Sequence, residues 1–255
     1  IYSHNRTEIT DLYNQGRVID LVQGNGFAKQ GYPARALFSI PFVGINEKGN
    51  PVCINEKGQA TVGDLNFQER DNTDYLIYEG STDPIYNGSL GNTFNYKGFH
   101  LNLFLTYAFG NVVRLDPVFK AKYNDLTSMN HDFKNRWMQP GDENVTNVPG
   151  VVSRYEYEQN RTLLSTAYNA YNYTSVRTAK GDFIRLKEIS LAYDFPHRWL
   201  ENSPVNNISL KLQATNLMLL YADKKLNGQD PEFMNAGGVA SPMPKQFTLT
   251  LKLGL

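Results

Sequence analysis

The last ten residues of the chain alternate strictly between apolar and polar side chains. A β-strand places every second side chain on one face, whereas an α-helix would scatter the same residues around its circumference. The length also matches the ~9–11 residues that a tilted strand needs to cross a bilayer. The pattern therefore predicts a strand over Gln246–Leu255 with one apolar face. Its apolar residues are Phe247, Leu249, Leu251, Leu253 and Leu255.

Three further segments show the same alternation. They are Phe99–Phe109, Asp182–Phe195 and Asn207–Thr215. In Asp182–Phe195 the apolar positions change phase at Lys187-Glu188, which predicts a β-bulge at that point. Each of these segments is therefore predicted to be a strand with one apolar face.

Weaker alternation adds three strand candidates, which are Ile1–Leu12, Ala34–Val43 and Gly91–Lys97. The dipeptide Lys97-Gly98 is typical of a tight turn that joins two strands into a hairpin. The sequence therefore predicts an all-β fold with about seven antiparallel strands.

The connections between these strands differ greatly in length. Phe195–Asn206 is short, whereas roughly 45–90, 111–180 and 218–245 are long and polar. Asp116–Trp137 has enough helix formers to predict a short loop helix that begins at Asp116-Pro117. Short turns at one end and long loops at the other are typical of an outer-membrane barrel. A soluble β-sandwich would show the same alternation, so these features alone leave both architectures open.

Composition excludes several classes of protein. The 25 basic and 25 acidic residues leave no basic excess with which to neutralise a nucleic acid. The single cysteine, Cys53, excludes an internal disulfide framework and a cysteine zinc cluster. No window reaches the ~18 consecutive apolar residues of a transmembrane helix.

Motifs that carry catalysis are absent from the sequence. The four histidines are far apart, without the spacing of a metal site. Neither a nucleophile elbow nor a phosphate-binding loop occurs. We therefore expect no enzyme activity, no metal and no cofactor.

Aromatic residues in the long connections are the candidate contacts with a ligand or partner. We select Trp137, Tyr171 and Tyr173, because such rings stack on sugar faces or pack against a partner protein. Packing of the same rings inside the protein is the alternative.

Several motifs in a fixed order resemble those of one transporter family. The segment Gly181–Pro196 reads G-D-F-I-R-L-K-E-I-S-L-A-Y-D-F-P and resembles the "G-[DS]-F-x-R-L-[KR]-x-[IL]-[ST]-L-x-Y-x-[FL]-P" signature of SusC/RagA-like TonB-dependent outer-membrane transporters. The family's other motifs are similar to Tyr86–Phe99, Ala214–Leu217, Gly228–Glu232 and Pro242–Leu249.

This resemblance implies a barrel of about 22 strands with a plug, of which residues 1–255 would be the C-terminal portion. The plug and the N-terminal strands are then expected outside this chain, because a partial sheet cannot close in lipid. The resemblance also implies the outer membrane of a Gram-negative bacterium, energy from TonB, and a SusD-like surface lipoprotein as partner. The cargo would be glycans or oligopeptides. A structural subunit of an outer-membrane assembly is the first alternative, and a soluble carbohydrate-binding sandwich is the second.

The order of the strands predicts the sides of the membrane. If Gln246–Leu255 runs toward the periplasm, the Lys97-Gly98 turn and the Pro196–Pro204 connection are periplasmic. All three long connections then become extracellular, where such barrels carry their long loops. In the last strand, Phe247, Leu249, Leu251 and Leu253 would face lipid. Thr248, Thr250 and Lys252 would face the lumen.

Overall fold

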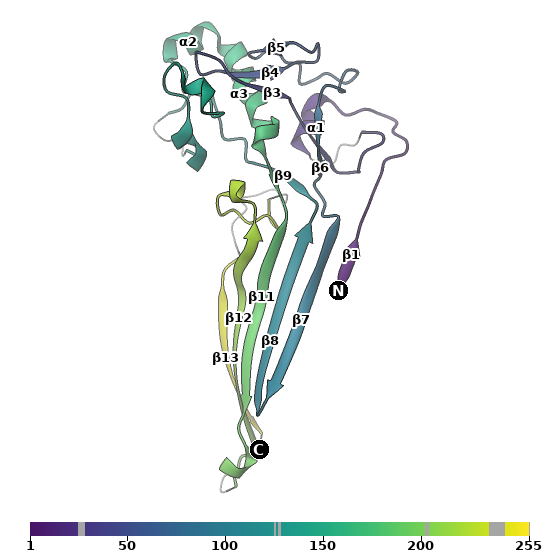
Figure 1. Cartoon of the computed structure of the whole chain (residues 1–255), viewed down its shortest axis with the longest axis vertical. Helices are drawn as coiled ribbons and strands as arrows, with labels where there is room; N and C mark the ends of the chain where they lie inside the picture. The colour runs from purple at the N-terminus through teal and green to yellow at the C-terminus, as the bar shows by residue number, and fades with distance from the viewer. Residues whose placement is uncertain (25–28, 125, 127–128, 202–203, 235–242, 255) are drawn as a thin grey trace.

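One long antiparallel sheet forms the body of the protein (Figure 1). The computed structural model describes all residues except 25–28, 125, 127–128, 202–203, 235–242 and 255. The strand order is β1-β7-β8-β11-β12-β13, and within the described residues β1 and β13 are the edges of a sheet that does not close. The strands are β1 (Tyr2–His4), β7 (Tyr86–Tyr96), β8 (Phe99–Phe109), β11 (Phe183–Asp194), β12 (Asn207–Ala222) and β13 (Gln246–Gly254).

The long connections gather at one end of this sheet, in a region that we call the cap (Figure 1). The cap comprises the described residues of 5–85, 110–182 and 223–234. The turn at Lys97-Gly98, the connection after β11 and the C-terminus lie at the opposite end, which we call the turn end. The cap strands are β2 (Ala36–Ser39), β3 (Phe42–Ile45), β4 (Pro51–Ile54), β5 (Ala60–Thr61), β6 (Ile77–Ser81), β9 (Val112–Arg114) and β10 (Thr178–Lys180). Its α-helices are α1 (Val18–Gln23), α2 (Arg154–Gln159) and α3 (Arg161–Asn172).

The register of the sheet sorts its side chains into one apolar and one polar face. A row across five strands aligns large apolar residues, and the next row, on the opposite face, aligns polar ones. The apolar row is Phe94, Leu101, Leu191, Leu212 and Leu249. The polar row is Thr93, Asn102, Ser190, Gln213 and Thr248. Leu249 is 69% exposed, so the apolar face is open to its surroundings rather than packed in a protein core.

The strong strand predictions are confirmed. Lys187 is the unpaired residue of a bulge, because the register of β11 shifts between Leu186 and Glu188 against both neighbouring strands. The predicted hairpin turn has positive φ at both central residues, 46° at Lys97 and 85° at Gly98. Positive φ at both positions matches the right-handed twist of the two strands that the turn joins. The last predicted residue, Leu255, lies outside the described residues.

Two of the weaker strand predictions are wrong in extent or place. Ile1–Leu12 contributes only Tyr2–His4 to the sheet. Ala34–Val43 lies in the cap, where β2 is buried along its whole length and β3 begins after it. The strand predicted over Ala34–Val43 is expected to have one apolar face. Because β2 is buried on both faces, it does not need that alternation.

The helix predicted over Asp116–Trp137 is also wrong. Its described residues contain one short 3₁₀ segment, His131–Asn135, and the helices come later, as α2 and α3. A sequence signal for α2 exists, because Ser153 caps it through a hydrogen bond from the Glu156 amide (3.2 Å). Serine followed three residues later by glutamate is typical of a helix N-terminus. No helix in the described ranges is long and apolar enough to cross a bilayer.

Candidate functional site

The sheet carries aromatic residues at both ends of its apolar face. At the turn end, the ring centroids of Phe99 and Tyr193 lie 4.4 Å apart. Toward the cap, Tyr107 and Tyr221 occupy the same row, eight residues along β8 from Phe99. Eight residues span about 27 Å of strand, comparable with the ~25 Å apolar band that outer-membrane strands present between aromatic girdles. The apolar face therefore fits the hydrocarbon layer of a membrane.

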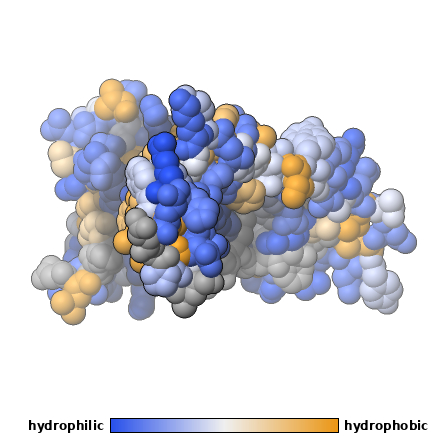
Figure 2. Space-filling model, turned by 90° about the horizontal axis from the view of Figure 1, so that it is seen from below, coloured by the Kyte–Doolittle hydropathy of each residue, from blue (hydrophilic) through white to orange (hydrophobic). Residues whose placement is uncertain are grey.

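A functional site for a soluble ligand is then expected in the cap or on the polar face. Seen end-on from the turn end, the cap extends beyond the sheet, and its visible surface is mostly hydrophilic, with isolated hydrophobic residues (Figure 2). The cap has its own apolar core, which joins α1, β2 and the end of α3. It is therefore a packed unit rather than a set of separate loops.

Arg114, at the end of β9, ties the elements of the cap together. Its guanidinium donates to the carbonyl oxygens of Thr174 and Phe38, both at 2.7 Å, and to that of Val22 at 3.3 Å. These partners lie after α3, in β2 and in α1. Burial lowers the pKa of Arg114 to about 10, so the group remains charged at neutral pH.

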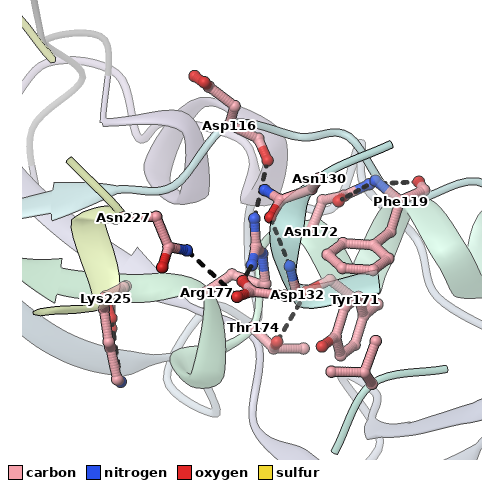
Figure 3. Close-up of polar contacts among 12 residues, drawn as sticks. Asp116, Phe119, Asn130, Asp132, Tyr171, Asn172, Thr174, Arg177, Lys225 and Asn227 are labelled. Carbon is pink, nitrogen blue, oxygen red and sulfur yellow. Dashed lines mark hydrogen bonds and ion pairs between the residues drawn. The ribbon is translucent and has the colours of Figure 1, made fainter. Parts of the chain in front are cut away.

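Arg177 makes a second junction, beside Phe119 and Asp132 (Figure 3). Its side chain is 3% exposed and forms an ion pair with Asp132, at 3.2 Å between Nη1 and Oδ2. The guanidinium carbon also lies 4.9 Å from the centre of the Phe119 ring. Asn227, in the connection after β12, donates to the other oxygen of Asp132 at 3.2 Å. The junction therefore joins distant parts of the connection between β8 and β11 and ties them to the connection after β12.

A buried ion pair joins two of the family-like motifs, Gly181–Pro196 and Gly228–Glu232. Arg185, on the polar face of β11, donates from Nη2 to both carboxylate oxygens of Asp230, at 2.5 and 2.6 Å. The Asp230 residue is fully buried, and Glu232 lies 3.2 Å from Nε of the same arginine. The connection between β12 and β13 is thereby anchored onto the polar face of the sheet.

The three predicted contact residues lie in the cap, and two of them are buried. Tyr171 is 2% exposed and packs edge-on against Phe119, with ring centroids 5.2 Å apart; burial raises the pKa of its hydroxyl. Tyr173 is 8% exposed, and its hydroxyl accepts a hydrogen bond from Gln23 at 3.3 Å. Trp137 is half-buried and donates from Nε1 to Glu143 at 2.9 Å.

These contacts give all three aromatic residues a role within the cap. Their contact with a ligand or partner stays a prediction, and for the two tyrosines it would need a change in the cap. Tyr155, in α2, is 79% exposed, but it is not one of the three predicted contact residues. Exposure depends on which elements cover a helix, so residue type alone could not separate Tyr155 from the buried rings.

The chain is similar to a TonB-dependent receptor and to solved structures of a peptide transporter. No family model matches it. The "TonB-dependent receptor P39" of Formosa agariphila is 26% identical over 192 residues, which is 71% of this chain and 17% of that protein. Two solved structures, of the RagAB peptide transporter and of the RagAB peptide importer in its open-open state, match with TM-scores of 0.67. Their identities are 21% and 20%, over 99% and 100% of this chain and 26% of each matched chain.

These findings confirm the expected resemblance to SusC/RagA-like TonB-dependent transporters. They also confirm the fold, which is the antiparallel sheet of part of an outer-membrane barrel. The chain spans about a sixth of the curated relative and about a quarter of the matched structures.

Proposed function

We propose that the chain supplies part of the barrel wall and the outward cap of a SusC-like transporter that imports glycans or oligopeptides. The single observation that carries this proposal is the apolar face of the sheet, which is bounded by aromatic residues about 27 Å apart along the strand. A soluble sandwich would bury such a face against a second sheet. No second sheet covers it among the described residues, and Leu249 and Leu251 are 69% and 58% exposed.

The cap is the proposed capture region. The cap contains all three long connections, and the Arg114 and Arg177 junctions join its segments 5–85, 110–182 and 223–234 over one end of the sheet. The chain is similar to the RagAB importer, whose solved structures include open-open and closed-closed states. We therefore infer that a SusD-like lipoprotein closes on this cap, and that TonB acts through parts of the transporter outside this chain.

The experiment uses the full transporter in its own bacterium and a membrane-impermeant maleimide. Cys53 is 1% exposed, and burial raises the pKa of its thiol to about 12, so this chain contributes no reactive background. In a background without other reactive cysteines, Lys57→Cys in the cap should be labelled on intact cells. Glu201→Cys at the turn end should be labelled only after the outer membrane is opened. Labelling of Glu201→Cys on intact cells would overturn the orientation.

Transport needs a separate measurement. Uptake of the glycan or peptide on which the gene is induced should stop when either the gene or TonB is deleted. A transporter that is correctly oriented but gives the same growth and uptake without TonB would support the alternative of a structural subunit.

A further inference from the structure

A cleft of about 320 Å³ lies in the cap between the segment 117–122 and helix α3. Its volume falls at the small end of the range for ligand sites, about 300–1,000 Å³. No acidic residue lines it within the described part of the chain. Its lining includes Phe119, Lys120, Lys122, Ser165, Asn169 and Asn172.

The two walls of this cleft carry hydrogen-bond donors. In the extended segment Phe119 and Ala121 are buried, whereas Lys120 and Lys122 alternate with them and are exposed. On the opposite wall, Ser165 and Asn169 are exposed one helical turn apart on α3. Lysine, serine and asparagine side chains all donate hydrogen bonds.

The floor of the cleft is fixed by Asn172, which lies beside Phe119 in Figure 3. Its buried amide accepts from the Phe119 backbone N–H at 3.0 Å and donates to the Phe119 carbonyl at 2.9 Å. It also donates to the Tyr168 carbonyl at 3.0 Å. These bonds hold the lysine segment against α3, so the walls keep their spacing without a ligand.

The electrostatic balance at the cleft is positive. Lys120 has no acidic partner within 4.0 Å among the residues that the structure describes. Lys122 lies 3.7 Å from Glu158 at the rim, but both side chains are about half exposed, so this pair is weak. The pKa of Tyr157 is lowered by its hydrogen bond with Ser165 (3.2 Å) and by the charges of Arg161 and Lys122.

We propose that this cleft binds a carboxylate group of the cargo, with Lys120 and Lys122 on one side and Ser165 and Asn169 on the other. Carboxylate is the anionic group that both proposed cargo classes share, since acidic sugars and peptide C-termini both carry it. The proposal rests on the proposed transport function and adds the chemical class that the cap selects. Glu158 would compete with the ligand for Lys122.

The test measures binding to the purified full transporter by calorimetry at low salt. The probes are tetragalacturonate and N-acetyl-tetra-alanine, each compared with its uncharged counterpart, the methyl ester or the C-terminal amide. At least one acid should bind more tightly than its uncharged counterpart, and its affinity should fall with added salt. The acid that does so identifies the source of the carboxylate.

Variants of the cleft give the decisive comparison. Lys120→Gln with Lys122→Gln should weaken binding of that acid about tenfold or more, because two charge-assisted hydrogen bonds are lost. Asn169→Asp should weaken it without changing either lysine, and Glu158→Gln should strengthen it. The matched control is Lys57→Gln, an exposed cap lysine outside the cleft, which should leave affinity unchanged. Heat-modifiability on a gel confirms that each variant is folded.

The outcomes separate this proposal from the function on which it rests. Equal binding of acids and uncharged counterparts, no binding of either acid, or full affinity in the double lysine variant overturns the carboxylate cleft. TonB-dependent uptake could still be intact in each of those cases. Carboxylate-selective binding without any TonB-dependent uptake would keep the cleft and overturn the transport function.

Discussion

Replacement of Arg185 by methionine should release the connection between β12 and β13 from the sheet. Methionine fills much of the same space but leaves the Asp230 carboxylate, which is fully buried, without its two short hydrogen bonds. Loss of one partner from a buried ion pair costs about 3–5 kcal/mol. Since each 1.4 kcal/mol is a factor of ten, the population of the released connection should rise about 100-fold to several thousand-fold.

Limited trypsin digestion of the folded full transporter measures this release. Lys224 and Lys225 lie in the anchored connection and provide the cleavage sites. When opening is fast relative to cleavage, the cleavage rate follows the open population. Arg198→Met, at an exposed position near the turn end, is the matched control and should leave the rate at these lysines unchanged.

A double variant isolates the ion pair from general damage. Arg185→Met with Asp230→Leu removes both buried charges, so the connection should regain much of its protection. The reasoning is refuted if Arg185→Met is cleaved no faster than Arg198→Met, or if the double variant is cleaved as fast as Arg185→Met.

Three further outcomes test other parts of the structure. Phe247 lies in the row midway between the two aromatic rows of the apolar face. Phe247→Arg should therefore destabilise the barrel by about 2–4 kcal/mol, whereas Thr248→Arg on the polar face should cost little; equal losses in urea titrations of the folded barrel would contradict the facing. Cys53 should stay unmodified by a small maleimide at pH 8 until the cap unfolds, because the thiol is buried and protonated; modification in the folded transporter would contradict its burial. The hydrogen bond from Arg17 lowers the pKa of Asp20 in the folded protein. The contribution of Asp20 to stability should therefore be complete above pH about 4 and be lost as the pH falls through the lowered pKa. The difference in cap proteolysis between wild type and Asp20→Asn should shrink in that acid range and stay constant from pH 6 to 8.

The sequence by itself determined the sheet and the two faces of its strands. Side-chain alternation depends only on neighbours along the chain, and a strand converts it directly into two faces. The bulge at Lys187 and the turn at Lys97-Gly98 were predicted for the same local reason. The family motifs, read in order, added the transporter resemblance that the comparisons support.

Only the tertiary structure decided the interior of the cap. Tyr171 and Tyr173 look like exposed binding residues in a polar connection, yet both are buried. The rings of Phe42 and Phe119 pack against Tyr171, and the ring of Phe67 packs against Tyr173. Lys120 and Asn169 are 49 positions apart and become two walls of one cleft through the bonds between Phe119 and Asn172. Arg185 and Asp230 are 45 positions apart and likewise come together only in the folded chain. Burial and juxtaposition of this kind depend on contacts between distant segments, which no local pattern in the sequence encodes.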